Sequence, residues 1–286
     1  MSAVREMRAR DWDRVASDYF TEVVSPLAAG LPRPLVHALD AVPDARRKTA
    51  ADLGCGIGTL LPALAARFGR VLGIDFSPAM LARARANCRA GNVALHRADL
   101  ADLRAFHGRV DVAITVNAVL TPDPDRLDRV FAELAATLRP SGVLLGIFPA
   151  MEAILYQGLL IHERERRRST PERARAKTSA ILEQAKYDFV HGTYREAETA
   201  QKFFYAFELE YRLRRAGFRH IRLGRVLYPW ETVGGYESFP AEPPMWDWLV
   251  RATRPAASRA GLRPALRAVD ASRPGRRRRR PRAARV

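Results

Sequence analysis

The stretch Asp52-Leu53-Gly54-Cys55-Gly56-Ile57-Gly58 decides the fold of this 286-residue chain. The short apolar run 49–53 that leads into it predicts a strand, and residues 59–68 after it have helical spacing. The glycines therefore predict a strand-to-helix turn, in which a ligand can approach bare backbone. A second apolar run, 71–74, ends at Asp75, and an acid at the tip of that strand can accept both hydroxyls of a ribose.

The spacing of this turn separates it from an ordinary dinucleotide site. Dinucleotide sites read GxGxxG, whereas this chain reads GxGxG with an acid two residues before the first glycine. That combination resembles motif I of the class I S-adenosylmethionine (SAM) methyltransferases. Further pieces resemble the family in the expected order: Asp75-Phe76-Ser77, Arg97-Ala98-Asp99-Leu100, the strand-like run 110–116 and the turn Leu138-Arg139-Pro140-Ser141-Gly142. The resemblance covers residues 45–150 strongly and 205–252 moderately.

The resemblance implies an α/β fold, a doubly wound seven-stranded Rossmann-like methyltransferase sheet with a helical insertion after the fifth strand. Residues 49–149 also alternate strand and helix by their own periodicity, which favours a parallel sheet with helices on both faces. The predicted organisation is an N-terminal helical cap at 1–48, a SAM-binding Rossmann-like core at 49–149, a helical insertion or lid at 150–201, the C-terminal part of the core at 202–255 and a disordered Arg-rich tail at 256–286.

Capping residues and spacing place the expected elements more finely. Asp11 can cap a first helix, on which Trp12, Ala16 and Tyr19 share one face. Ser77-Pro78 is a second helix start. The strands are expected at 49–53, 71–74, 93–97, 110–116, 142–148, 218–228 and 245–253, and the helices of the core and insertion at 59–68, 124–138, 151–165, 171–187 and 207–217.

SAM is the cofactor that the resemblance implies, and matching positions receive roles in binding it. Asp52 would take the amino group of the methionine part, Asp75 would hold the ribose hydroxyls, and Asp99 would accept from the adenine amine. The full set implied for the cofactor is Asp52, Gly54, Cys55, Gly56, Gly58, Asp75, Phe76, Ser77, Met80, Asp99, Leu100 and Asn117. Taken alone, Met80 is more typical of a core and Asp99 of a helix cap.

The acceptor pocket is expected where the insertion and the N-terminal helix meet the sheet. The cofactor already carries a reactive methyl group, so the protein mainly aligns the acceptor, and a general base is needed only if the nucleophile must lose a proton. The sequence singles out no catalytic residue and no metal site. The residues expected to line the cofactor or acceptor pocket are Trp12, Tyr19, Tyr156, His162, Tyr187, His191 and Tyr194. Alternatively, these aromatics only pack the cap and the insertion onto the sheet.

The net charge of +17 invites a nucleic-acid partner, but its distribution weakens that interpretation. The tail 256–286 alone carries a net +10, which leaves +7 for residues 1–255. Nucleic acid is therefore expected only through the tail, and a solvated appendage is the favoured interpretation. No apolar run is long enough for a membrane span, the N-terminus lacks an apolar leader, and two cysteines do not make a disulfide framework, so we expect a cytoplasmic protein.

The sequence therefore predicts an enzyme, a SAM-dependent methyltransferase that acts on a small molecule by in-line displacement. The segment Asn117-Ala118-Val119-Leu120 lacks the Asn/Asp-Pro-Pro-aromatic tetrad of enzymes that methylate amino groups on nucleobases or glutamine. Two alternatives stay open: an RNA or protein methyltransferase that uses the Arg-rich tail as an anchor, and a non-catalytic SAM-binding regulatory protein. A dehydrogenase is disfavoured by GxGxG and Asp52. The sequence sets neither the acceptor, nor the atom methylated, nor the oligomeric state.

Overall fold

The computed structural model describes residues 5–18, 25–27, 30, 32–184, 187–196, 198–230 and 238–256. By its internal contacts the chain divides into two units, residues 1–256 and 257–286. Nearly all of the predicted tail lies outside the described residues, and so does Tyr19. No helix in the described ranges is long and apolar enough to cross a membrane.

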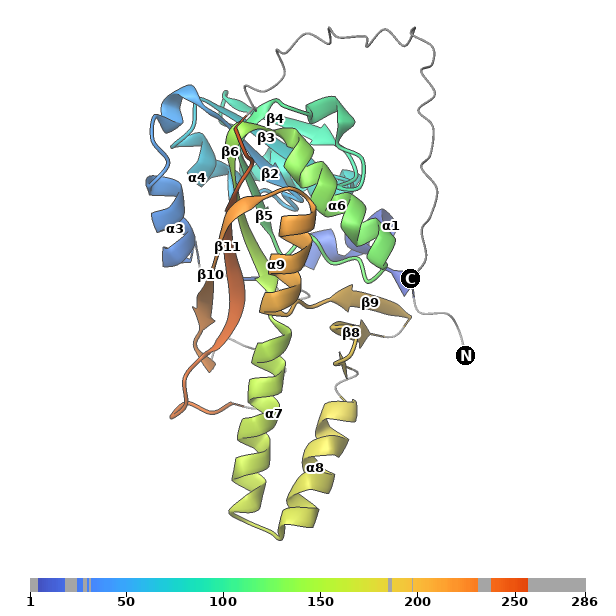
Figure 1. Ribbon diagram of the computed structural model, residues 1–286. Helices are drawn as coiled ribbons and strands as arrows, with labels where there is room; N and C mark the ends of the chain where they lie inside the picture. The colour runs from blue at the N-terminus through green and yellow to red at the C-terminus, as the bar shows by residue number, and fades with distance from the viewer. Residues whose placement is uncertain are drawn as a thin grey trace, which may run out of the picture. The chain divides into compact units, whose positions relative to one another are not determined.

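A seven-stranded sheet forms the centre of the first unit (Figure 1). In spatial order its strands are β10 (Arg219–Tyr228), β11 (Met245–Thr253), β6 (Leu138–Pro149), β5 (Val110–Val116), β2 (Thr49–Leu53), β3 (Arg70–Asp75) and β4 (Val93–Arg97). The strands from β6 to β4 are parallel, whereas β11 is antiparallel to β6 and β10 is antiparallel to β11. This confirms the predicted sheet, and the chain order reverses between β2 and β5.

Helices cover both faces of the sheet, because consecutive strand residues point to opposite sides. On β2, for example, Ala50 belongs to one core cluster and Ala51 to the other. The helices that pack on the Ala50 side are α3 (Arg33–Asp40), α4 (Leu61–Ala65) and α5 (Pro78–Asn87). Those that pack on the Ala51 side are α6 (Pro124–Thr137) and α9 (Ala206–Arg215). With both faces covered, the carboxyl ends of the strands are left as the place where a ligand can enter.

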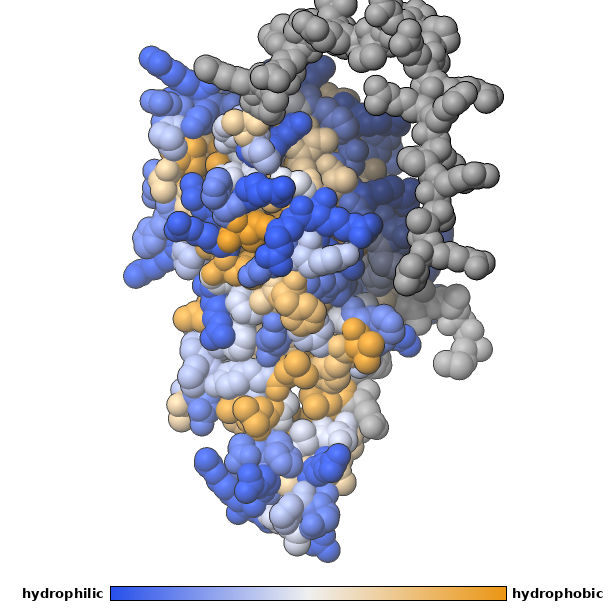
Figure 2. All heavy atoms as spheres, viewed as in Figure 1, coloured by the Kyte–Doolittle hydropathy of each residue, from blue (hydrophilic) through white to orange (hydrophobic). Residues whose placement is uncertain are grey.

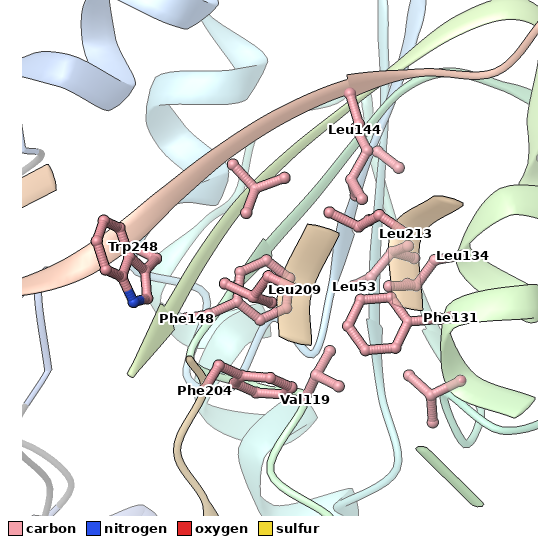
Figure 3. Packing of buried hydrophobic residues seen from close by; sticks show 14 of the residues in the cluster. Leu53, Val119, Phe131, Leu134, Leu144, Phe148, Phe204, Leu209, Leu213 and Trp248 are labelled. Atoms are coloured by element: carbon pink, nitrogen blue, oxygen red, sulfur yellow. The ribbon is translucent and has the colours of Figure 1, made fainter. Parts of the chain in front are cut away.

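Three phenylalanines hold α6 and the segment before α9 against the sheet. Phe131 comes from α6, Phe148 from β6 and Phe204 from the segment that leads into α9, and each is at most 1% exposed. Their ring centroids lie 5.3 to 6.1 Å apart. Figure 3 shows them beside Leu209 and Leu213 of α9. Burying one such side chain contributes about 1.5–3 kcal/mol, so this cluster anchors the helices that flank β5 and β6.

The first helix of the core is shorter than its sequence predicts. The helical spacing at 59–68 is real, since Leu60, Leu61, Leu64 and Phe68 are all buried, yet α4 covers only five residues. Pro62 has no amide to donate, and the glycine turn immediately before the helix keeps its first residues in turns instead. Elsewhere the expected strands and helices of the core agree with the structure to within a few residues.

The N-terminal cap begins differently from the expectation. The structure places α1 at Ala9–Val15 with Arg8, not Asp11, at the N-cap. Asp11 instead occupies the third helical position and accepts from the backbone amide of Arg8 at 2.8 Å. It also receives the guanidinium of Arg5, which holds the pKa of Asp11 well below its usual range. The acid therefore still stabilises the start of the helix, but from inside its first turn.

The insertion after β6 begins with two helices, as predicted. The helices α7 (Met151–Arg166) and α8 (Pro171–Gln184) pack against each other as a hairpin that extends away from the large sheet (Figure 1). The loop that joins them carries Arg167 and Arg168, and Figure 2 shows the far end of the hairpin as hydrophilic. Apolar residues gather closer to the sheet in that view. The hairpin is thus a projecting arm, not a cover folded back over the sheet.

The rest of the insertion is a small sheet, which corrects the expectation that residues 150–201 are helical. Its strands are β7 (Tyr187–Asp188), β8 (Thr193–Glu196) and β9 (Thr199–Lys202), and β9 also pairs in parallel with β1 (Arg5–Glu6). Strands of two to four residues are too short for an alternation of apolar and polar side chains to be recognised in the sequence. Their pairing with the N-terminus joins segments that lie far apart in sequence, so helical spacing in the preceding residues could not reveal it. Short 3₁₀ turns complete the fold at Ala16–Asp18, Ala45–Arg47 and Arg104–Phe106.

We expect a chain that ends after Ala256 to fold and bind ligand like the full chain. The backbone of Arg254 closes the fold by donating to Gly142 and accepting from Ser141, so the cut must lie beyond it. Since the first unit ends at Ala256, the melting temperature should stay within about 2 °C of that of the full chain. Differential scanning calorimetry measures this, and a large drop would show that residues 257–286 pack on the body.

Candidate active site

A pocket opens at the carboxyl ends of the central parallel strands, where the chain order of the sheet reverses. It holds about 870 Å³ of space, counting its open mouth. The residues predicted from the sequence that line it are Trp12, Gly54, Gly56, Asp75, Phe76, Met80, Asp99, Leu100 and Asn117. Asp52 and Cys55 line a smaller pocket that shares Gly54 and Val116 with the larger one. The structure therefore brings most of the predicted cofactor residues together.

The glycine turn fits closely against two neighbouring elements. Gly54 has a φ of +80°, and a Cβ built on it would lie 2.2 Å from the Cβ of Ala118, just after β5. Gly58 has a φ of +79°, and its Cβ would lie 2.9 Å from the Cβ of Ala84 on α5. A side chain at either position would strain the backbone and collide with its neighbour. The turn therefore presents bare backbone to the pocket between β2 and β5.

Asp75 ends β3 with both carboxylate oxygens held by backbone amides. The amides of Gly56 and Ser77 each donate to one oxygen at 2.9 Å. Burial raises the pKa of Asp75, and these two hydrogen bonds oppose the rise. Ser77 then caps α5, because its hydroxyl accepts from the amide of Met80 and donates to Asp13. Each carboxylate oxygen has a further lone pair, so a rigid Asp75 can accept from two hydroxyl groups in the pocket.

Asp52 lies on β2 behind the turn and is only 2% exposed. Burial, and secondly the negative charge of Asp75, raises the pKa of Asp52 to about 7. A carboxyl group in such surroundings ionises readily only when a positive charge comes close. The smaller pocket that Asp52 lines would therefore favour a cationic group.

Asp99 is paired with a cation that the sequence analysis missed. Arg126, in the first turn of α6, places Nη2 at 2.8 and 2.6 Å from the two carboxylate oxygens of Asp99. Its Nε lies 3.2 Å from Glu6 of β1, which also accepts from the hydroxyl of Thr121. One feature of the sequence indicates that Arg126 lies near the pocket: it comes two residues after the proline that begins α6. A helix that starts beside a strand end points its first turn at the rim of the pocket.

Comparison with known proteins identifies the part of the chain that carries this pocket. Residues 50–142 match the family model described as a methyltransferase domain. This segment is a class I SAM-dependent methyltransferase domain. The match confirms the predicted family, whose cofactor is SAM. The methyltransferase domain contains the glycine turn, Asp75 and Asp99.

Two curated relatives resemble the chain over part of its length. A trans-aconitate 2-methyltransferase from Escherichia coli is 36% identical over 134 residues, which cover 45% of this chain and 50% of the relative. The enzyme of that name from Methylobacterium radiotolerans is 42% identical over 117 residues, covering 39% of this chain and 42% of the relative. The chain thus spans about half the length of the curated relatives that it matches.

Solved structures share the fold of the methyltransferase domain and its flanking elements. A SAM-dependent methyltransferase from Methanosarcina mazei aligns with a TM-score of 0.54 at 16% identity, over 78% of this chain and 98% of the other. A SAM-dependent methyltransferase from Mesorhizobium loti aligns with a TM-score of 0.51 at 18% identity, over 80% and 98%. At such identities the likeness establishes the fold alone.

The residues of the methyltransferase domain fit SAM on three observations. The backbone cradle at Gly54 would be filled by any side chain. The carboxylate of Asp75 is held rigid at the pocket wall. The side-chain oxygen of Asn117 is buried and has no hydrogen-bond partner among the described residues, so it can accept from a bound group. When bound, SAM supplies an electrophilic methyl group.

The N-terminal helix α1 packs over one wall of the methyltransferase domain. Trp12 lines the pocket, and it also packs against the cluster formed by Ala16, Ile57 and Met80. Met80 is 2% exposed, so it belongs to the core and to the pocket wall at once. Asp13 fixes α1 in place by accepting from the hydroxyl of Ser77 at 2.6 Å.

The other predicted acceptor residues lie in different contacts. Tyr156 packs against Trp246 of β11, and Tyr187 packs against Tyr194, Phe189 and Phe203 inside the small sheet. The ring of His162 lies 3.5 Å from the hydroxyl of Thr178 on α8, and His191 pairs with Asp188. The described residues that line the larger pocket do not include Tyr156, His162, Tyr187, His191 or Tyr194. The described residues also hold no group of three or more His, Cys, Asp or Glu side chains suited to a metal ion.

The small sheet still reaches the pocket, through residues that the sequence did not mark. Gln201 of β9 lines it, and so do Glu6 and Met7 at the end of β1. Gln201 donates to the sulfur of Met7, and Arg126 holds Glu6. The paired strands β1 and β9 therefore contribute to the pocket lining, and Arg126 of the methyltransferase domain links Glu6 to Asp99.

A cluster of polar side chains connects Asn117, which lines the pocket, to the last two strands of the sheet. Asn117 follows β5 directly, with a φ of +46°, and donates through Nδ2 to Asp247 of β11 at 3.0 Å. The hydroxyl of Tyr228 on β10 donates to the same carboxylate oxygen at 2.8 Å. Sequence reasoning named Asn117 alone, because its two partners come from the last antiparallel strands.

Proposed function

We propose that this chain transfers the methyl group of SAM to a small-molecule acceptor. The observation that carries the proposal is the pocket itself, which joins the rigid Asp75, the bare turn at Gly54 and a polar wall at Asn117. The ribose of SAM would need the acid, its methionine part the bare turn and the reacting groups the polar wall, and the pocket has these three features together. The protein's contribution is alignment, which supplies on the order of 7–11 kcal/mol in favourable cases.

For the cofactor we propose one orientation along the sheet. Asp75 takes the ribose hydroxyls, and Asp52 faces the amino group of the methionine part. Adenine lies towards Asp99 and the amide of Leu100, with Phe76 and Met80 beside the ring. The remaining contacts come from the turn and from the start of α5, through Gly54, Cys55, Gly56, Gly58 and Ser77. Arg126 competes for Asp99, so the adenine amine shares that carboxylate with the guanidinium.

A small acceptor is supported by the borders of the pocket. Residues of the paired strands β1 and β9 line it, and so does Trp12 of α1. A large polymer would need an open approach to the reacting group. The curated relatives are named for trans-aconitate, a small molecule, which agrees with this proposal. The described cysteines, Cys55 and Cys88, are buried free thiols, and we propose the cytoplasm as the compartment on that basis.

Calorimetry and a methyl-transfer screen test the function. We expect SAM and S-adenosylhomocysteine to bind and NAD to bind far more weakly. Incubation with deuteromethyl-labelled SAM and a polar metabolite extract should then produce a labelled small molecule, detected by mass spectrometry. Tighter binding of NAD than of SAM would end the proposal. Bound SAM without transfer to any extract component would favour a regulatory protein instead.

An RNA or protein acceptor is the alternative, and the Arg-rich tail is the feature that favours it. Binding of RNA to the full chain, but not to a chain ending at Ala256, would support it if the affinity falls steeply with salt. Label appearing in the RNA or protein fraction of a whole-cell lysate incubated in parallel, with none in the polar metabolite extract, would establish it.

The affinity for SAM should depend on pH through Asp52. The pKa of Asp52 is raised to about 7, so the carboxyl is largely protonated at pH 5.5 and ionised above pH 7.5. The cationic amino group of SAM favours the ionised form, so binding should tighten as pH rises through this window, on the order of tenfold. Titration calorimetry in buffers of different ionisation enthalpy should show proton release at pH 6. Asp52→Asn should flatten the profile, and an unchanged profile would remove Asp52 from the amino-group site.

A further inference from the structure

The larger pocket has the opposite charge to the chain as a whole. The chain has 48 lysines and arginines against 31 acids, and residues 1–255 alone carry a net +7. Among the described residues that line the pocket, however, Glu6, Asp75 and Asp99 are acids and Arg126 is the single cation. The described lining of the smaller pocket adds the acid Asp52 and no cation. The described part of the site is therefore negative in a basic protein.

Two carboxylates neutralise the cation of the pocket. Nη2 of Arg126 lies 2.8 and 2.6 Å from the two carboxylate oxygens of Asp99, and Nε lies 3.2 Å from Oε1 of Glu6. The other oxygen of Glu6 accepts from the hydroxyl of Thr121 at 2.5 Å, which holds the glutamate in place. All four residues line the pocket. An anionic group that approached Arg126 would therefore also come close to two carboxylates.

The other cations of β1 and β9 are engaged elsewhere. Arg5 of β1 places its two Nη atoms 2.5 and 2.9 Å from the carboxylate oxygens of Asp11. Lys202, the last residue of β9, places its ammonium 2.8 Å from Glu208. Neither Arg5 nor Lys202 is among the described residues that line the two pockets. Because consecutive strand residues point to opposite sides, the strands that bring Glu6 to the pocket do not also bring a free cation.

The proposed cofactor contacts use only part of the pocket lining. Asp75 and Asp99 are assigned to the ribose and adenine of SAM, whose two cationic groups and one carboxylate suit a negative pocket. The described residues left for the acceptor are uncharged apart from Glu6 and Arg126, which pair with each other. The uncharged ones include Met7, Trp12, Leu120, Thr121 and Gln201. An acceptor would therefore contact apolar and uncharged polar groups around one ion pair.

We propose that Glu6 is a specificity-determining residue, which neutralises Arg126 and so restricts the acceptor to molecules without carboxylate or phosphate groups. This inference rests on the proposed function and names the charge class of its substrate. An anion that leaves water for this pocket finds no unpaired cation among the described residues, and nearby carboxylates repel it. The acceptor is therefore uncharged or cationic. The tricarboxylate trans-aconitate, for which the curated relatives are named, falls outside this class.

The test compares wild type with Glu6→Gln and the control Glu210→Gln. Glu210 also pairs with an arginine, Arg214 at 2.9 Å, but it lies on α9 and lines neither pocket. Titration calorimetry measures the binding of trans-aconitate and of its uncharged trimethyl ester to each protein loaded with S-adenosylhomocysteine. Separately, the polar metabolite extract is divided on an anion-exchange resin, and both fractions are incubated with deuteromethyl SAM. Melting temperature and S-adenosylhomocysteine affinity are measured alongside.

The expected pattern depends on charge and not on folding alone. Wild type should transfer label to the unretained fraction, with about tenfold less in the retained, anionic fraction, and should bind the ester at least about tenfold more tightly than trans-aconitate. Glu6→Gln keeps an acceptor for Thr121 but removes a negative charge, so its affinity for trans-aconitate should rise about tenfold while its affinity for the ester stays within about twofold. A purely structural role would weaken both ligands. Glu210→Gln should match wild type.

Three outcomes would overturn the proposal. Label mainly in the retained fraction, or tighter binding of trans-aconitate than of its ester by wild type, would show that the charge class is wrong, while leaving the proposed function intact. No gain in trans-aconitate affinity in a folded Glu6→Gln protein would show that Glu6 does not set that class. Wild type that binds SAM but transfers no label to either fraction would overturn the proposed function, and this inference with it. If Glu6→Gln does not fold, the two wild-type comparisons decide.

Discussion

Replacing Gly54 by alanine should remove most of the affinity for SAM and destabilise the fold. The added Cβ would lie 2.2 Å from the Cβ of Ala118, and the residue has a φ of +80°. Left-handed strain costs an L-residue about 1–2 kcal/mol, and overpacking adds about 1–3 kcal/mol. The turn would have to move away from β5, which displaces the backbone that faces the ligand. Thermal unfolding and titration calorimetry measure both effects.

Alanine substitutions at two other glycines distinguish the cost of backbone strain from the cost of a steric clash. Gly108 has a φ of +65° with nothing within 4 Å of an added Cβ, so Gly108→Ala should cost only the strain. Gly91 has open space and no such φ, so Gly91→Ala should be close to neutral. The affinity for SAM should be unchanged in both. If Gly54→Ala behaves like Gly108→Ala and binds SAM normally, the contact with Ala118 does not shape the pocket.

Asp75→Ala should weaken the binding of SAM and S-adenosylhomocysteine by about 1.5–3 kcal/mol, which is roughly tenfold to 150-fold. The physical reason is the loss of an acceptor that the amides of Gly56 and Ser77 hold in one orientation. Because both ligands have the same ribose, both should lose affinity equally. Titration calorimetry with each ligand measures the change.

Asp111→Ala is the matched control for this variant. Asp111 lies at the start of β5, at the opposite end of the strands, and it also holds a backbone amide, that of Thr49, at 2.8 Å. It should lower stability without changing affinity. Because Asp75 also stabilises the turn, melting temperatures must accompany the titrations. Normal SAM affinity in a folded Asp75→Ala protein would show that the ribose is bound elsewhere.

The residues around the pocket show why aromatic side chains in the sequence did not predict the pocket lining. Tyr156, Tyr187 and Tyr194 pack with other rings of the small sheet and of β11. Burial of large apolar rings stabilises these peripheral parts wherever they lie, so rings near a predicted lid need not face the ligand. The residues that do border the pocket, such as Gln201 and Glu6, are polar and common on surfaces. Nothing in their local sequence distinguishes them.

Local pattern was sufficient for the centre of the fold. The glycine turn, the apolar runs of β2 to β6 and the capped helices α5 and α6 follow from spacing within a few residues, because strand and helix periods are set by the backbone itself. The acids Asp52 and Asp75 were found in the same way, since each sits at a fixed offset from the turn. These features lie within one continuous stretch of chain.

Only the tertiary structure decided the rim of the site. The pairing of β1 with β9 joins Arg5 to Thr199, and the bond from Asn117 to Asp247 spans 130 residues. Arg126 meets Asp99 and Glu6 because α6 begins beside the ends of the strands. Such contacts depend on how separate elements pack. The sequence around a charged or amide side chain does not indicate which distant residue that side chain will contact. The sequence by itself determined the sheet and the glycine turn, whereas packing between distant elements determined which residues border the pocket.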